Sequence, residues 1–211
     1  MPGRRRAGRL SRVGLVGWCL YRRTVGFTKE QLEAHRDRPV PDLLGRGCRL
    51  LFVGINPGLW TAATQTHFCH PSNRFYPALR RAGLIDWAVD SDQGMTDRQR
   101  GDLMRVGVGI TNLVNRATAR ASELTREELR TGARRLGDLV TEVRPVVVAV
   151  AGVTAFRDAF ARPEAILGRQ GSDLGPAQVW VVPNPSGLNA HETIDTLSGW
   201  YLRVARAAGI A

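Results

Sequence analysis

Short apolar runs alternate with amphipathic segments along most of the chain, and this pattern predicts strands separated by helices. Four apolar runs bounded by Gly, Pro or Asn indicate buried strands: "RLLFVGI" (49–55), "VGVGITNLV" (106–114), "VVVAVAG" (146–152) and "AQVWVVP" (177–183). Helical spacing occurs at 27–36, 73–82, within 90–105, at 125–143, at 154–160 and at 195–208. Residues 56–72 are expected to form a long loop.

The alternation of strands and helices predicts βαβ units. A sheet built from such units is mainly parallel and is covered by helices on both faces. We therefore expect an α/β fold, a single three-layer domain around a mainly parallel, four-stranded sheet. The best-marked helix follows Thr125, because Thr125 and Glu128 have the spacing of a capping box and Pro145 lies just past its end.

Two of the predicted strands end in the same short turn. Asn56, Pro57 and Gly58 follow the first strand, and Asn184 and Pro185 follow the last. In open parallel sheets, ligands bind in a crevice outside the carboxyl ends of the strands. Both turns are therefore expected to face one shared crevice.

The net charge of +11 is concentrated at the start of the chain. Residues 1–29 hold seven Arg and Lys29 with no acidic residue, so the remainder carries 22 basic and 19 acidic side chains. We predict a basic, disordered arm over 1–29 and one folded domain over 30–211. Such an arm can attract DNA through counterion release, although a solvated tail has the same composition. Its apolar part is short and lacks a cleavage signal, which argues against export.

The cysteines indicate neither a cross-linked scaffold nor a metal protein. Cys19, Cys48 and Cys69 are far apart, a spacing that suits a reducing cytoplasm and not disulfides, iron–sulfur clusters or structural zinc. "HFCH" (67–70) contains three potential metal ligands, but no fourth follows at ligand spacing. We predict no metal and no other cofactor. No apolar run approaches the roughly 20 residues that cross a bilayer, so no membrane partner is expected.

Several familiar sites are missing. There is no GxxxxGK[ST] phosphate loop, and "GVGI" lacks the third glycine of a dinucleotide fingerprint. Ser186 does not lie in a G-x-S-x-G elbow, which argues against a serine hydrolase.

Asn56 has two interpretations. An Asn before Pro is commonly a turn former whose side chain bonds its own backbone. An amide just beyond a buried strand, beside rigid Pro57 and open Gly58, can instead orient a water molecule or contact a ligand. Because an amide cannot accept a proton as a carboxylate does, this second interpretation predicts a dissociative reaction with a good leaving group.

Four motifs together resemble the mismatch-specific uracil/thymine-DNA glycosylases of the uracil-DNA glycosylase superfamily. They are "GINPGL" (54–59), "HPSNRF" (70–75), "GITNLVNRAT" (109–118) and "NPSGLN" (184–189), they occur in the family's order, and they span about residues 49–190. The resemblance implies hydrolysis of the bond between deoxyribose and a uracil flipped out of double-stranded DNA at a G·U or G·T mispair. It also implies a monomer that acts on the bacterial nucleoid.

The resemblance assigns roles around the flipped base. Asn56 would position the attacking water, backbone groups of Ile55 and Phe68 would meet the base edge, and the Phe68 ring would stack on uracil. Phe68 could also be an ordinary core aromatic. Thr61 would lie near the base, and Gly58 would leave room for the base to approach closely. Some relatives carry Lys at the position of Asn112, and the residue at this position is associated with the range of bases that the enzyme removes. The other candidates in the base pocket are therefore Gly58, Thr61 and Asn112.

A second group of residues would enter the DNA. These are Asn184, Ser186, Gly187, Leu188 and Asn189. Leu188 would be a wedge that fills the space left by the extruded nucleotide, and Gly187 with Asn189 would face the opposing guanine.

Lys29, the only lysine, bears on the outcome of the reaction. Glycosylases that also cut the backbone use an amine to form a Schiff base with the sugar. Because Lys29 precedes the region of resemblance, we predict a monofunctional enzyme that leaves an abasic site.

Two alternatives stay open. The first is a catalytically weak lesion-binding protein that uses the same crevice, because more active relatives have Asp where this chain has Asn56. The second is a module that acts on free nucleosides.

Overall fold

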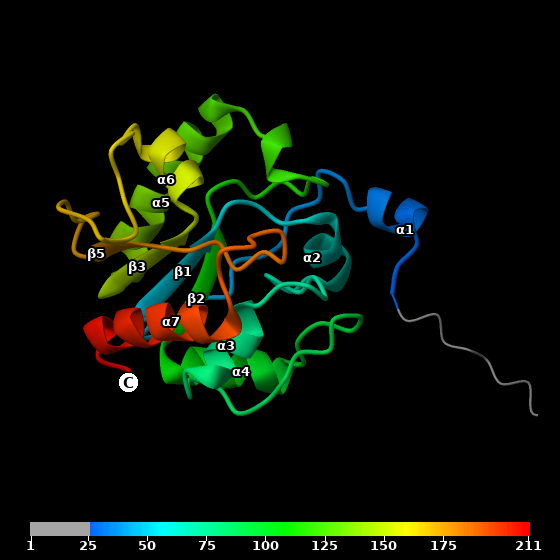
Figure 1. The fold of residues 1–211 in the computed structure, drawn as a ribbon, viewed down its shortest axis with the longest axis horizontal. Coiled ribbons are helices and arrows are strands. Elements are labelled where there is room, and N and C mark those ends of the chain that lie inside the picture. Colours follow the sequence, from blue (N-terminus) through cyan, green and yellow to red (C-terminus); the bar gives the residue numbers. More distant parts are fainter. Residues whose placement is uncertain (1–25) are drawn as a thin grey trace, which may run out of the picture.

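The computed structural model describes residues 26–211, which surround one five-stranded sheet (Figure 1). The strands are β1 (Leu50–Gly54), β2 (Val108–Asn112), β3 (Val147–Ala151), β4 (Gly168–Arg169) and β5 (Gln178–Val182). Their order is β2-β1-β3-β5-β4, with parallel pairing throughout except between β4 and β5. The predicted α/β fold with a mainly parallel sheet is confirmed. Residues 1–25 of the predicted arm lie outside the described residues.

The fifth strand was not predicted. β4 has two residues, which pair antiparallel with Val181 and Trp180 of β5. Neither Gly168 nor Arg169 is buried, so the strand has no apolar run by which the sequence could reveal it.

Helices cover both faces of the sheet, as the three-layer prediction requires (Figure 1). The helices are α1 (Lys29–Glu33), α2 (Leu59–Thr64), α3 (Phe75–Arg81), α4 (Asp97–Val106), α5 (Arg126–Val143), α6 (Val153–Phe160) and α7 (Ile194–Ala208), with a 3₁₀ turn, η1, at Ala121–Glu123. One hydrophobic core lies under α3, α4 and α7, and a second lies under α5 and α6.

Strand β1 supplies side chains to both cores. Leu50 and Phe52 belong to the first core, and Leu51 and Val53 belong to the second. Because successive residues of a strand point to opposite faces, a strand buried on both faces is apolar without interruption. This explains the run "RLLFVGI" at the start of the sheet.

The capping box predicted at Thr125 is present. The Thr125 hydroxyl accepts from the Glu128 backbone at 3.1 Å, and the Glu128 carboxylate accepts from the Thr125 backbone at 2.8 Å. The helix ends at Val143, with Arg144 in the left-handed region, and Pro145 follows two residues before β3 begins.

The prediction of a long loop over 56–72 is wrong for its first half, which contains α2. Gly58 caps this helix, and Leu59 and Ala62 pack with Val40 and Ala117 in a small third core. A helix of six residues is too short to show a clear period in the sequence.

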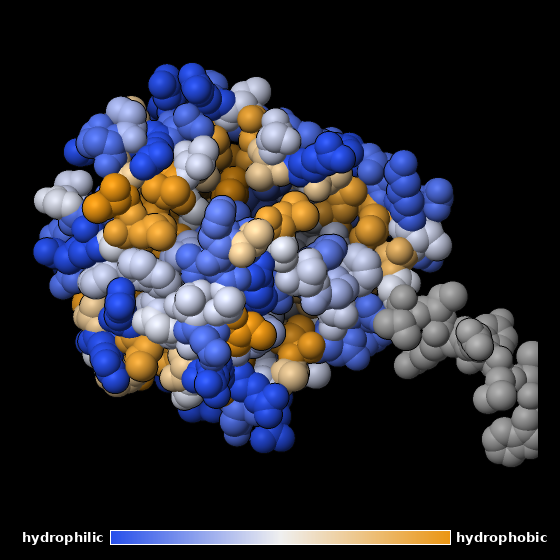
Figure 2. All heavy atoms as spheres, in the orientation of Figure 1, coloured by the Kyte–Doolittle hydropathy of each residue, from blue (hydrophilic) through white to orange (hydrophobic). Residues whose placement is uncertain are grey.

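The surface is mostly hydrophilic in the view of Figure 2, where apolar residues form separate patches. Within residues 26–211, no helix combines the length and the apolar character that crossing a bilayer requires.

Candidate active site

A cavity of about 300 Å³ lies outside the carboxyl ends of the parallel strands. Nine of the eleven predicted site residues line it, and two, Gly187 and Asn189, do not. The lining residues from the prediction are Ile55, Asn56, Gly58, Thr61, Phe68, Asn112, Asn184, Ser186 and Leu188. The two Asn-Pro turns therefore share one crevice, as their positions after β1 and β5 predict.

The side-chain amide of Asn56 is held in one orientation. Its Nδ2 lies 3.0 Å from the carbonyl oxygens of Pro57 and Arg116 and 2.8 Å from the hydroxyl oxygen of Thr118. Because a carbonyl can only accept, the nitrogen must face these groups. The Oδ1 has no hydrogen-bond partner among residues 26–211 and is left to bind water. The contact with Pro57 shows that the turn-forming interpretation also holds in part.

Thr118 is a site residue that the sequence reasoning missed. Its hydroxyl donates to the carbonyl of Arg120 at 2.8 Å, so its oxygen can only accept from Asn56. Thr118 is 1% exposed and lines the cavity. The available signal was its place as the last residue of "GITNLVNRAT".

Ion pairs fix the segment that holds Asn56. The Arg116 guanidinium binds the carboxylates of Glu128 and Asp37, each at 2.8 Å. The hydrogen bond from Arg116, with help from the capping box at Thr125, lowers the pKa of Glu128 to about 2. Glu128 therefore joins the start of α5 to the loop whose carbonyl receives the Asn56 amide.

Asn112 is oriented by a buried histidine. His67 Nε2 lies 3.0 Å from the carbonyl of Pro41, so it carries the proton, and Nδ1 accepts from Asn112 Nδ2 at 3.1 Å. Burial lowers the pKa of His67, which keeps the ring neutral. The Asn112 oxygen then lies over Gly54, where an added Cβ would meet it at 2.3 Å.

Phe68 is packed on the core and also lines the cavity, while its stacking on uracil stays a prediction. Its ring stacks on Phe75 with centroids 4.2 Å apart, which ties it to the core, and it also lines the cavity. Its φ of 57° is in the left-handed region, which is costly for an aromatic residue. The segment holds this backbone in place: the Tyr76 hydroxyl donates to the carbonyl of the preceding residue, His67, at 2.8 Å.

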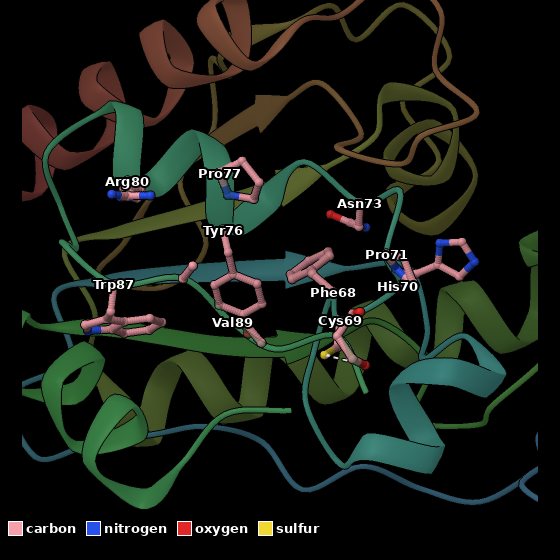
Figure 3. Close-up of a pocket in the computed structure, with 12 residues that line it drawn as sticks. Phe68, Cys69, His70, Pro71, Asn73, Tyr76, Pro77, Arg80, Trp87 and Val89 are labelled. Carbon is pink, nitrogen blue, oxygen red and sulfur yellow. Dashed lines mark hydrogen bonds between the residues drawn. The ribbon is translucent and has the colours of Figure 1, made fainter. Parts of the chain in front are cut away.

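A smaller cavity of about 180 Å³ adjoins the first, and Phe68, His70 and Asn73 line both. Figure 3 shows Phe68 in the middle of this smaller cavity, with Tyr76 and Trp87 to one side and Asn73 and His70 to the other. Phe68 therefore forms part of the wall of both cavities.

The possible metal ligands in "HFCH" have separate partners. Both ring nitrogens of His67 are engaged with Pro41 and Asn112, and Cys69 Sγ contacts the Asp90 and Ser91 carbonyls. Over residues 26–211, no three His, Cys, Asp or Glu side chains form a group that could hold a metal ion.

The 184–189 segment, here called the wedge loop, exposes Leu188 to solvent over 94% of its surface. The Asn184 oxygen accepts from the Ser186 backbone, and Asn189 Nδ2 donates to the Asn184 carbonyl, both at 3.0 Å. Gly187 lies so close to Ser72 that an added Cβ would be 2.4 Å from the hydroxyl. The loop is therefore folded on itself and against residues 72–74, and the contact of Gly187 and Asn189 with guanine stays a prediction.

The fold and the site define an α/β protein with an amide-lined cavity at the carboxyl edge of its sheet. Residues 41–206 match the model of the uracil DNA glycosylase superfamily, and the chain belongs to this superfamily. Membership supports a DNA glycosylase activity.

A solved structure has the same fold. It is the solution NMR structure of a protein from Methanosarcina acetivorans, provisionally assigned as a uracil DNA glycosylase, with a TM-score of 0.55 and 18% identity. The match covers 82% of this chain and 98% of that protein. At this identity the similarity concerns the fold.

Proposed function

We propose that the protein is a monofunctional DNA glycosylase that removes uracil mispaired with guanine in double-stranded DNA. The observation that carries this proposal is the orientation of Asn56. Its nitrogen is bound to Pro57, Arg116 and Thr118, so its oxygen is the atom presented to a water molecule in the cavity.

The proposed reaction begins with a base flipped into the cavity. Flipping costs a few kcal/mol and is easiest at a mispair, which favours G·U and G·T before any contact with the cavity. Leu188 would enter the stack and hold the duplex open.

The amide of Asn56 suits the chemical step. Uracil leaves as an anion, its carbonyls gain negative charge, and the sugar carbon becomes electrophilic before water adds. An amide can align this water through its oxygen without removing a proton. The backbone N–H of Phe68 has no partner in the described chain and can donate to a base carbonyl.

Asn112 gives the site a basis for choosing the base. Because His67 accepts from its nitrogen, its oxygen is free to accept the N3–H of uracil or thymine. Cytosine has an acceptor at N3, so a lone pair on this nitrogen would face a lone pair on the Asn112 oxygen, and no hydrogen bond would form. Thr61, which also lines the cavity, is 6% exposed and narrows the space around the base.

The sole lysine supports hydrolysis without strand cleavage. Lys29 begins α1 and is not among the residues that line the cavity. A borohydride-stable adduct between protein and uracil-containing DNA would contradict a monofunctional enzyme.

The basic arm is proposed to strengthen the binding of DNA. The protein is proposed to act in the cytoplasm, as a monomer. Phe27, at the end of the arm, packs edge-on against Trp60 with centroids 5.0 Å apart, and Trp60 contacts His70 on the rim of the cavity. The arm therefore joins the domain beside the proposed DNA surface. Deleting residues 1–25 should reduce the salt dependence of DNA binding and leave the base preference unchanged.

Excision assays test the main proposal. End-labelled duplexes with G·U, G·T, A·U or G·C, and single strands with uracil, are incubated with the protein and then with alkali. Scission at uracil, fastest for G·U and lost in Asn56→Ala, is expected. A duplex that is bound but not cut would favour the alternative of a lesion-binding protein, and release of uracil from free deoxyuridine would favour a nucleoside hydrolase.

A further inference from the structure

Arg74 makes an unusual set of contacts with the wedge loop. Its backbone N–H donates to the Pro185 carbonyl at 2.9 Å. Its guanidinium donates to the carbonyls of Ser186 at 2.7 Å and Asn189 at 2.8 Å, and also to that of Glu192. One residue therefore binds three carbonyls of the wedge loop and a fourth just beyond it, at Glu192.

We infer that Arg74 is a positioning residue that presets the wedge loop for insertion into duplex DNA. The inference rests on the proposed function. Arg74 precedes α3, more than 100 residues before the loop, yet its side chain does not cap that helix. The planar fork of a guanidinium can bind several carbonyls at once, which an ammonium group on a flexible stem cannot reproduce.

The loop has few other means of holding its shape. Its internal bonds are short-range contacts of Asn184, Ser186 and Asn189. Leu188, at its tip, is almost fully exposed and makes no core contact that would fix it. With Arg74 in place, the loop is ordered before DNA arrives, so less conformational entropy is lost when Leu188 enters the stack.

The charge of Arg74 has no counterion within the described chain, since none of the ion pairs of residues 26–211 includes it. The guanidinium therefore keeps a positive charge at the base of the loop, where phosphates of the opened duplex would pass. Arg74 therefore combines two effects, the ordering of the wedge loop and a positive charge beside the DNA. Substitutions can separate them.

The test compares Arg74→Ala and Arg74→Lys, which keeps the charge but not the fork. The matched control is Arg81→Ala, an exposed arginine of α3 that pairs with Asp195. Excision is measured for uracil opposite guanine, opposite adenine, and opposite an abasic-site analogue, where no base pair has to open.

We expect kcat/KM to fall about tenfold or more for the two paired substrates in both Arg74 variants, and less than about threefold opposite the abasic analogue. Arg81→Ala should match the parent protein. Equal losses on all three substrates would overturn the inference, because they would indicate a damaged cavity. Full activity of Arg74→Lys would also overturn it, because charge alone would then account for the role of Arg74.

A second measurement does not depend on catalysis. In an Asn56→Ala background, the fluorescence of 2-aminopurine placed next to uracil reports base flipping, and adding Arg74→Ala should reduce that signal. If the parent protein never excises uracil, the proposed function fails, but this signal still tests Arg74. Gly187→Ala, which forces the loop away from Ser72, should reproduce the Arg74 pattern if an Arg74 variant does not fold.

Discussion

The two Asn-Pro turns have the same sequence start and opposite uses of the amide. Asn56 donates through its nitrogen to Pro57 in its own turn and to Arg116 and Thr118 beyond it, and keeps its oxygen free. Asn184 accepts through its oxygen from Ser186, within its own loop. The difference teaches that the tertiary partners of an asparagine, and not the Asn-Pro pair, decide whether the amide serves chemistry or architecture.

The sharpest way to break this comparison is to remove each amide in turn. Asn56→Ala should lower kcat for G·U excision by about 10²–10³-fold, as expected when one preorganised polar group is lost from a reacting centre. Asn184→Ala should cost only about fivefold, the value of one backbone cap of about 1 kcal/mol. Single-turnover kinetics on the G·U duplex measures both.

Duplex binding supplies the control for this pair. Affinity for a duplex that contains a non-hydrolysable uracil analogue should be nearly unchanged in Asn56→Ala and weaker in Asn184→Ala. If both variants lost kcat equally, the contrast between chemistry and architecture would be wrong.

Thr118 tests whether orientation of Asn56 matters separately from its presence. Thr118→Val keeps the shape but removes the shortest of the three contacts that orient Asn56 Nδ2, so the amide is held less firmly. We expect kcat to fall about tenfold with little change in KM, the size of one polar contact of about 1.4 kcal/mol. Thr118→Ser, which retains the hydroxyl, should recover most of the rate, and an inactive Thr118→Ser would point to a packing role.

The smallest expected effect concerns His67 and stability. Burial lowers the pKa of His67 below its ordinary value of 6.5, so the unfolded state binds more protons as pH falls below that value. The stability that neutral His67 contributes is therefore present above pH 6.5 and declines as pH falls toward its lowered pKa. Urea unfolding at pH 7 and pH 5 should show a smaller loss in His67→Gln than in the parent protein, and equal losses would mean that His67 does not titrate in this window.

Local signals made much of the fold predictable. β1 is apolar without a break because both of its faces are buried, and α5 carries a capping box in its sequence. α2 and β4 were missed because six and two residues cannot display a period. The number of strands was therefore wrong by one, while the layers were correct.

The site was predictable where motifs name residues and unpredictable where side chains meet across the fold. Ile55, Asn56 and Asn184 belong to motifs that resemble a family, and they do line one cavity. The link from Pro41 through His67 to Asn112 joins three residues that no single short motif contains together. Such partners are revealed only when the tertiary structure brings distant segments together.

Gly54 lies directly behind two side chains that line the cavity. The oxygen of Asn112 and the ring of Phe68 already occupy the place where a methyl group would go, at 2.3 Å and 3.1 Å from it. Any side chain at position 54 would push Asn112 and Phe68 into the cavity, so a variant for a bulkier base has to keep this glycine. Redesign has to begin at the walls, with Ile55 or Thr61.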